Sequence, residues 1–488
     1  MIAFFAEHID VSFVVFLLYI ADFAVAGTII FLERKDASAT IAWVMLVFVV
    51  PVAGIVLYFL LSQNIARMKL FRLTGAEKES VETPLREQIE SMEHGRFVWA
   101  NEEERRWGSL IQLNQSYAKA YLTQNNEVEI FTEGVKMFDA LLESIAAAEE
   151  RIHAEYYIIK NDGTGQALLR ALTEAAGRGV SVRLLADALG TRSLDKGLLR
   201  KFEAAGGKIA FFFPPKFVKL NLRFNYRNHR KLVLVDGKTG YLGGFNIGDE
   251  YLGKKKKFGL WRDTHLRVRG ACAGDLDARF LLDWRLASRE DVNIARAYYD
   301  FGAAAGDTSM QIVSSGPDSS RQEVKHAYLK MISGAKRSIY IQTPYFVPDE
   351  SIFDSLLTAA FAGVDVRIMI PSIRDHIFVY WATLYYCGLL LRAGVKVYLY
   401  QNGFLHAKTI CADGEVCSVG SANFDIRSFR LNFETNAFIF DKGQAGRMDA
   451  IYARDMAHCT ELTREMYDRR PALVKIREAL AKLVSDLL

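Results

Sequence analysis

The feature that most constrains this chain is a run of polar residues that occurs twice with identical spacing. In each copy a histidine is followed by a lysine after two positions, by Asp-Gly after seven, and by an asparagine after seventeen. The copies are His229, Lys231, Asp236, Gly237 and Asn246, and His406, Lys408, Asp413, Gly414 and Asn423. Packing alone gives no reason to repeat polar residues inside apolar segments, so the repeat indicates one functional site made by both copies.

Each copy also has the pattern of a β-hairpin. Residues two positions apart project from the same face of a strand, so the histidine and the lysine are expected side by side. Asp-Gly then predicts a turn, and Asp236 and Asp413 are best interpreted as residues that hold this turn. The returning strand brings Asn246 or Asn423 back beside the histidine of its own copy.

The segments around the motifs are duplicated as well. Residues 152–157, 179–183 and 205–209 recur as 339–344, 363–367 and 393–397. Short β-rich runs alternate with helical runs in both halves, which is typical of α/β folds. We therefore expect two duplicated α/β domains, 109–300 and 301–488, the second with a C-terminal helical tail, after a polar linker at 65–108.

Charge is concentrated rather than general. The chain has 61 basic and 57 acidic residues, which excludes a uniformly basic nucleic-acid coat. Residues 214–270 nevertheless carry fourteen Lys and Arg against four Asp and Glu. An aromatic and basic insertion, 211–220, overlaps the start of this stretch and is interpreted either as an interfacial loop or as a partly buried surface loop. Nucleic acid would fit the same charge, but the apolar N-terminus favours an anionic membrane surface as partner.

Two long apolar runs, 11–32 and 41–61, open the chain. At ~1.5 Å per residue each is long enough to cross ~30 Å of hydrocarbon, so 1–64 predicts a transmembrane helical hairpin. A cleaved signal peptide is less consistent with the sequence, because no Lys or Arg precedes the first run. A re-entrant pair stays open. Asp22 is expected to face the partner helix or another subunit, unless it is simply a tolerated polar residue.

The remaining composition bears on the compartment. Basic residues are more frequent after the second apolar run than around the first, which predicts a cytoplasmic main body on the inner membrane. The five cysteines form no C-x-x-C pair, and the nine histidines have no zinc-type spacing. We therefore expect a reducing compartment and neither a metal nor another cofactor.

At residues 110–488 the sequence resembles the phospholipase D superfamily, which is marked by two H-x-K-x-x-x-x-D motifs, and within it the bacterial cardiolipin synthases. The matching features are the doubled motif, 40–43, 225–231, 248–253, 261–263, 420–428 and the helical tail after 469–471. The resemblance implies two phospholipase D-like α/β/α sandwich domains that share one active site at a pseudo-two-fold axis.

The resemblance also implies the roles of individual residues. The candidate catalytic set is His229, Lys231, Asp236, His406, Lys408 and Asp413. His229 would be the nucleophile and His406 the general acid and base, although the symmetry of the motifs leaves the reverse open. The lysines, Asn246, Asn423 and Ser421 would bind phosphate, with Ser421 equally explained as a small strand residue. Each histidine needs a carboxylate to orient it, and Asp263 is the candidate for His229 and Glu434 for His406.

The implied reaction is transfer of a phosphatidyl group from one phosphatidylglycerol to another through a phosphohistidine, which gives cardiolipin and glycerol. The first alternative is a membrane-bound phospholipase D that makes phosphatidic acid. A nuclease or phosphodiesterase and an inactive lipid-binding scaffold are further alternatives, although no nucleic-acid partner is expected. Phosphatidylethanolamine as donor, and assembly into a homo-oligomer, are left open by the sequence.

Overall fold

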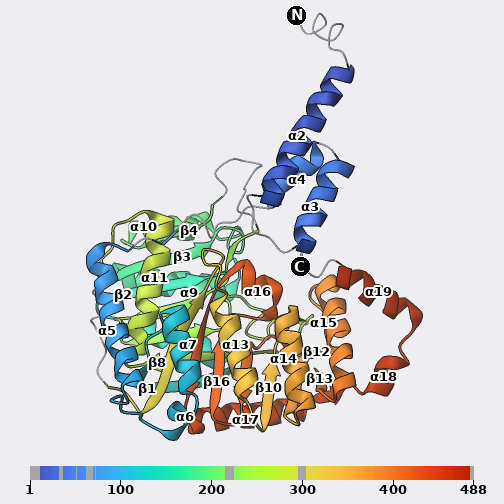
Figure 1. The fold of residues 1–488 in the computed structure, drawn as a ribbon. Helices are drawn as coiled ribbons and strands as arrows, with labels where there is room; N and C mark the ends of the chain where they lie inside the picture. Colours follow the sequence, from blue (N-terminus) through green and yellow to red (C-terminus); the bar gives the residue numbers. More distant parts are fainter. Residues whose placement is uncertain are drawn as a thin grey trace, which may run out of the picture. The chain divides into compact units, whose positions relative to one another are not determined.

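The computed structural model describes residues 11–31, 37–50, 52–61, 70–71, 73–214, 225–294 and 304–483 (Figure 1). The chain divides into two compact units, of which the first comprises 1–67 with 215–225 and the second comprises 68–214 with 226–488. Most of the insertion expected to form an interfacial loop, from 215 on, lies outside the described residues. That interpretation therefore stays a prediction.

The N-terminal unit contains three apolar helices, α2 (Val11–Phe31), α3 (Ala37–Val49) and α4 (Ala53–Leu61). The second apolar run is therefore two helices, where the sequence predicts one. The rings of Trp43 and Tyr58 lie 5.6 Å apart, whereas fifteen residues of continuous helix would separate them by about 22 Å. Val52 between the helices has a φ of +65°. Helix α4 thus folds back on α3.

The structure gives two further facts about this unit. Asp22 is buried, and neither of its carboxylate oxygens has a hydrogen-bond partner within the part of the chain that the structure describes. Among those same residues, no helix combines the length and the apolar character needed to cross a membrane.

The segment expected to be a linker, 65–108, contains two helices, α5 (Gly75–Glu93) and α6 (Glu102–Arg106), and a third, α7 (Gly108–Ala118), begins at its last residue. Its side chains bond to both duplicated halves. Glu77 pairs with Arg285 of the first half at 2.5 Å, and Arg106 pairs with Asp413 of the second. These residues are therefore packed against both halves.

The two halves have corresponding elements. The first contains β1 (Thr123–Glu133), α8 (Gly134–Ala146), β2 (Arg151–Tyr156), α9 (Gly163–Gly177), β3 (Ser181–Asp187), α10 (Lys196–Ala204), β4 (Lys208–Phe212), β5 (Arg227–Asn228), β6 (Lys231–Val235), β7 (Thr239–Gly243), β8 (Trp261–Arg269) and α11 (Cys272–Ser288). The second contains β9 (Thr308–Ser315), α13 (Glu323–Gly334), β10 (Ser338–Gln342), β11 (Phe346–Val347), α14 (Glu350–Phe361), β12 (Asp365–Pro371), α15 (Ile377–Leu390), η2 (Leu391–Ala393), β13 (Lys396–Tyr400), β14 (Phe404–Leu405), β15 (Thr409–Ala412), β16 (Val416–Gly420), β17 (Phe424–Asp425), α16 (Ile426–Arg430), β18 (Asn432–Phe440), α17 (Lys442–Met456), β19 (Cys459–Glu461), α18 (Arg464–Asp468) and α19 (Ala472–Leu483).

Strand pairing confirms the duplication. The first half has the order β4-β3-β2-β6-β7-β8-β1, and the second has the same order, β13-β12-β10-β15-β16-β18-β9. In both, the first three strands are parallel and the rest antiparallel. The equivalent strands β1 and β9 pair antiparallel with each other, as a two-fold relation between the halves requires. The predicted fold class, two duplicated α/β domains, is confirmed.

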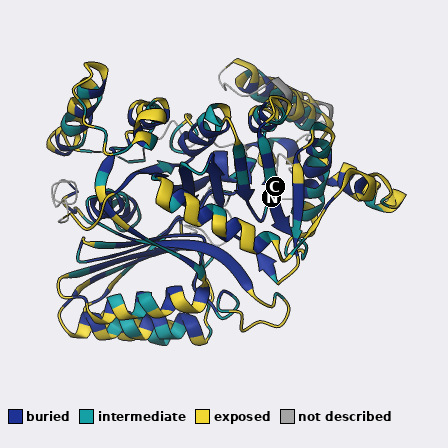
Figure 2. Ribbon diagram, turned by 90° about the horizontal axis from the view of Figure 1, so that it is seen from below, coloured by how far each residue is buried: buried dark blue, intermediate teal, exposed yellow. Residues whose placement is uncertain are grey.

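The cores lie on both faces of this sheet. One apolar cluster, which includes Leu168, Leu184 and Val233, fills the first half, and another, which includes Ile368 and Ile410, fills the second. Figure 2 shows the strands buried between helices whose outer faces are exposed. The polar residues of the motifs are therefore placed by strands that cannot shift without opening a core.

Asp236 and Asp413 hold the hairpin turns and lie away from the histidines. The carboxylate of Asp236 accepts hydrogen bonds from the backbone N–H groups of Glu149, Glu150 and Arg151, at 2.8–3.0 Å. Asp413 accepts the equivalent bonds from residues 336–338. Both aspartates have positive φ, +52° and +59°. Each aspartate ties its turn to the start of β2 or β10, which supports the interpretation that it holds the turn. A catalytic part for either residue stays a prediction.

The first prediction concerns Asp236. Burial raises its pKa, but the three backbone N–H groups outweigh this and hold the pKa below the ordinary value. Asp236→Asn keeps a side chain that tolerates positive φ but removes the charge, so we expect unfolding free energy to fall by about 1–3 kcal/mol. Because the folded-state pKa is depressed, the difference is full above about pH 4 and disappears as pH falls through the folded-state pKa.

The measurement is the thermal unfolding midpoint in detergent from pH 7 to pH 3. Asp139→Asn, at an exposed position on α8, is the matched control and should leave the midpoint unchanged. A difference for Asp236→Asn that does not vary with pH would contradict the role of the ionised carboxylate.

Candidate active site

The two histidines are placed by strands that cross between the halves. The short strand β5, just before His229, pairs in parallel with β18 of the second half, and the His229 N–H donates to the Phe433 carbonyl at 2.9 Å. In the same way β14, just before His406, pairs with β8 of the first half, and the His406 N–H donates to the Arg262 carbonyl at 2.7 Å. Each histidine therefore lies beside the first residues of a strand of the other half's sheet.

The carboxylate that faces each histidine also comes from the opposite half. Nδ1 of His229 lies 3.0 Å from both carboxylate oxygens of Glu434, and Nδ1 of His406 lies 2.7 Å from Oδ2 of Asp263. The sequence assigned each carboxylate to the histidine of its own half, and that assignment is wrong. Glu434 and Asp263 lie on β18 and β8, the strands that receive β5 and β14, so the partners are exchanged.

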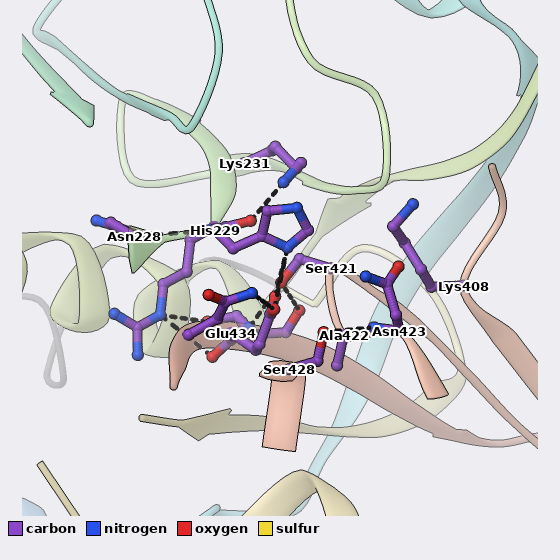
Figure 3. Close-up of polar contacts among 12 residues, drawn as sticks. Asn228, His229, Lys231, Lys408, Ser421, Ala422, Asn423, Ser428 and Glu434 are labelled. Atoms are coloured by element: carbon purple, nitrogen blue, oxygen red, sulfur yellow. Dashed lines mark hydrogen bonds and ion pairs between the residues drawn. The ribbon is translucent and has the colours of Figure 1, made fainter. Parts of the chain in front are cut away.

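The lysines are more buried than the histidines. The side chains of His229 and His406 are 11% and 9% exposed, which leaves each ring a narrow access to solvent. Lys231 donates from Nζ to the His229 carbonyl at 2.5 Å, and Lys408 donates to the His406 carbonyl. Figure 3 shows the His229 imidazole between Lys231 and Glu434, with Lys408 and Asn423 to one side. The hairpins bring both motifs to one place.

Burial and charge set the protonation of these groups. Burial lowers the pKa of Lys231 to about 7 and that of Lys408 to about 8. Burial also lowers the pKa of both histidines, to about 4 for His406, where the nearby Lys408 acts in the same direction. Both rings are therefore neutral at pH 7. A neutral imidazole that donates from Nδ1 to a carboxylate leaves the Nε2 lone pair for chemistry.

The carboxylates remain ionised in spite of full burial. Burial alone would raise the pKa of Glu434, but the facing His229 and Lys231 hold it below the ordinary value. Burial would raise the pKa of Asp263 as well, and Lys408 and His406 outweigh it. Each histidine thus faces a fixed negative charge that stabilises a positively charged or phosphorylated ring.

The two asparagines predicted to bind phosphate each use one polar atom in a hydrogen bond with the protein. Oδ1 of Asn246 accepts from the Ile158 N–H at 3.2 Å, and Nδ2 of Asn423 donates to Asp425 at 3.1 Å. Oδ1 of Asn423 is buried and has no partner in the described part of the chain. Phosphate binding by these asparagines therefore stays a prediction.

Ser421 is explained by the strand beside it. Its hydroxyl accepts from the Thr435 N–H at 3.0 Å, which braces β16 against β18 next to Glu434. The equivalent residue of the first half is Gly244, where a Cβ would overlap the Asp263 carboxylate. The bracing contact supports the structural alternative that the sequence left open for Ser421.

Sequence reasoning missed an aromatic wall around the histidines. The Tyr157 ring lies 5.0 Å from that of His229, and the Trp261 and Tyr345 rings lie 5.1 and 6.4 Å from that of His406. Tyr345 in turn donates its hydroxyl to Asp375. Tyr157 directly follows β2, the strand that pairs with the Lys231 strand, but only the register of that pair makes its position evident.

A metal site is not evident in this region. Within the described ranges, no group of three His, Cys, Asp or Glu side chains is arranged to hold a metal ion.

Comparisons with known proteins agree with the geometry. The family model described as "Cardiolipin synthase, PLD-like domain" matches residues 141–264 and 328–456, and "Phospholipase_D-nuclease N-terminal" matches residues 20–63. A cardiolipin synthase of Oceanobacillus iheyensis is 46% identical over 97% of this chain and 98% of its own length. The major cardiolipin synthase ClsA of Bacillus subtilis is 46% identical over 98% and 99%.

A solved structure supports the fold. The crystal structure of phosphatidylserine synthase from Haemophilus influenzae superposes with a TM-score of 0.62 at 15% identity, over 78% of this chain and all of that one. At this identity the likeness concerns the fold alone. Together with the full-length relatives, the strand order and the paired histidines, the comparisons show that the chain belongs to the cardiolipin synthase family of phospholipase D-like enzymes.

Proposed function

We propose that this protein transfers a phosphatidyl group from one phosphatidylglycerol to another and so makes cardiolipin and glycerol. The observation that carries the proposal is the pair of neutral histidines, each fixed at Nδ1 by the carboxylate of the opposite half. Membership of the family supports the same reaction. Phosphatidylglycerol would be both donor and acceptor.

The first half-reaction uses both imidazoles. Nε2 of His229 attacks phosphorus, a P–N bond forms, and the P–O bond to the glycerol headgroup breaks. Because His406 is neutral in the free enzyme, its ring first takes up a proton from water. The protonated ring then delivers this proton to the departing glycerol oxygen and is left neutral. Glu434 compensates the charge on the phosphorylated His229 ring, because its carboxylate stays ionised. The exchange of Glu434 and Asp263 makes both halves necessary for this step.

The second half-reaction reverses the first. His406 takes a proton from the free glycerol hydroxyl of a second phosphatidylglycerol, and that oxygen attacks phosphorus. The P–N bond breaks, His229 is restored and His406 is again protonated. Lys231 and Lys408 stabilise the charge on the non-bridging oxygens in both transition states. Water in place of the second lipid would give phosphatidic acid, so the product distinguishes a transferase from a hydrolase.

We also propose that the N-terminal helices anchor the enzyme in the inner membrane, with the catalytic body on the cytoplasmic side. The apolar composition of α2, α3 and α4 and the basic residues that follow them support this. The fold-back of α4 on α3 favours a re-entrant second run over a second crossing.

The second prediction tests the reaction itself. His229→Ala and His406→Ala should each abolish conversion of phosphatidylglycerol vesicles to cardiolipin and glycerol, measured by mass spectrometry of the lipids. If the wild type made phosphatidic acid alone, the enzyme would be a hydrolase and the proposed transfer would be wrong. Peptide mapping after an alkaline quench should find the phosphatidyl adduct on His229, and an adduct on His406 would reverse the two roles.

The third prediction concerns the exchanged carboxylates. Glu434→Gln should lower kcat by roughly 10²–10⁴-fold, because the histidine loses its fixed tautomer and its counter-charge. Because Glu434 raises the pKa of His229, the substitution should lower that pKa further. The pKa of His406 should not change. The rate of carbethoxylation of each histidine peptide as a function of pH measures this. Asp263→Asn is the matched variant, and it should change the pH dependence of carbethoxylation for the His406 peptide only.

The fourth prediction concerns pH. Burial lowers the pKa of Lys231 to about 7 and that of Lys408 to about 8, so both lose their charge as pH rises through this range. We expect kcat/KM, which reports the free enzyme, to fall on the alkaline side between about pH 7 and 9. A rate that keeps rising to pH 9 would show that the lysine charges are not required.

A further inference from the structure

Helix α19 has two apolar faces, and only one of them packs against the protein. On the packed face Ala481 joins a cluster with Val347 and Ala382, and Glu478 is buried against Arg470 at 2.8 Å. The second face carries four side chains at spacings of three, four and three residues, which places them in one stripe. They are Leu473, Ile476, Leu480 and Leu483, which are 57%, 54%, 57% and 74% exposed.

The apolar surface continues onto α15, the helix that α19 packs against (Figure 1). Helix α15 has no charged residue in its length, and it begins with Ile377 and Phe378, which are 57% and 60% exposed. Arg477 of α19 lies over the Trp381 ring of α15 at 5.7 Å. We name the six exposed side chains of the two helices the α15–α19 patch: Ile377, Phe378, Leu473, Ile476, Leu480 and Leu483.

The exposed charged side chains of α19 are of one sign. Along α19 the apolar stripe is flanked by Lys475, Arg477 and Lys482, all exposed. The only carboxylate in α19 is Glu478, which is buried and bonded to Arg470. An apolar stripe bordered by long cationic side chains is the pattern of a helix that lies in the interface of an anionic bilayer.

The patch begins next to the active site. Ile377 follows the segment of Asp375 and His376, and Asp375 accepts the hydroxyl of Tyr345. The Tyr345 ring lies 6.1 Å from that of His376 and 6.4 Å from that of His406. A short chain of contacts therefore leads from the exposed apolar surface to one of the two catalytic histidines.

We propose that the α15–α19 patch seats the catalytic body on an anionic phospholipid bilayer, with the access to His406 at the membrane surface. A headgroup can then reach the histidine while its acyl chains stay in an apolar phase, which avoids the cost of drawing them into water. The tyrosines and tryptophan of α15 suit this position, because amphipathic aromatic side chains are favoured at membrane interfaces. The choice of phospholipid rests on the proposed function, but contact with the bilayer does not.

The direct test places a probe on the patch. Leu473→Cys and Ile476→Cys, each in a Cys459→Ser background, are labelled with an environment-sensitive fluorophore, since the other four cysteines are buried. The full-length protein is reconstituted into vesicles of phosphatidylglycerol and phosphatidylcholine with and without a spin-labelled lipid. Val98→Cys, at an apolar residue that is 80% exposed in the segment before α6, is the matched control.

We expect the spin-labelled lipid to quench the probes at 473 and 476 and to leave the probe at 98 unquenched. Equal behaviour of all three probes would overturn the proposal. Self-quenching of the 473 and 476 probes in lipid-free detergent, with no quenching by lipid, would assign the patch to a second copy of the chain and would also overturn it.

A second measurement separates seating from catalysis. Leu480→Asp should lower the rate on phosphatidylglycerol vesicles about tenfold, since loss of one leucine contact changes the seated population by about that factor. Its rate on dispersed short-chain phosphatidylglycerol should be unchanged, and Val98→Asp should affect neither. An equal loss of rate on both substrates would show that the substitution damages the active site. It would contradict the proposal that the patch binds the bilayer. If the wild type made no cardiolipin, the proposed function would be wrong. The quenching experiment would still show whether the α15–α19 patch contacts the bilayer.

Discussion

The reciprocal exchange of two short strands is the interaction on which the site depends. Strands β5 and β14 each contain two residues, yet each carries a motif histidine onto the sheet of the opposite half. His229 is bonded to Phe433 through its backbone and to Glu434 through its ring, while His406 is bonded to Arg262 and Asp263. Neither half alone holds a histidine together with its carboxylate. The site exists only when both halves are folded and docked.

Buried ion pairs secure the exchanged segments. Arg230, between His229 and Lys231, donates to Asp283 of its own half at 2.8 Å and to the Thr435 hydroxyl of the other half at 2.9 Å. Arg262, next to Asp263, bonds to Asp455 of the second half at 2.9 Å. A buried pair of this kind adds little net stability, but removing one partner costs about 3–5 kcal/mol because the other charge is left buried. The pairs therefore fix the register of the crossing more than they strengthen the fold.

The sequence allowed the duplication, the hairpins and the two histidines to be predicted, because a repeated polar code in apolar strands has few explanations. The exchange could not be predicted. Glu434 lies 205 residues from His229, and Asp263 lies 143 residues from His406, so sequence distance favoured the wrong pairing. Likewise, the second apolar run has the length of a span, and only the ring contact between Trp43 and Tyr58 reveals the fold-back. In each case a long-range contact overrides a local pattern.

The symmetry of the backbone is not matched by the surroundings of the two rings, and this difference favours the different roles proposed for the two histidines. Two carboxylate oxygens face Nδ1 of His229, whereas one oxygen of Asp263 and the Lys408 ammonium, both at 2.7 Å, face Nδ1 of His406. A ring that forms a P–N bond gains positive charge and benefits from the undivided carboxylate, which supports His229 as nucleophile. A ring that only shuttles a proton needs an easily changed charge, and a neighbouring cation makes His406 release its proton readily. The duplicated fold thus supplies two equivalent positions, and a single lysine contact is enough to make them unequal.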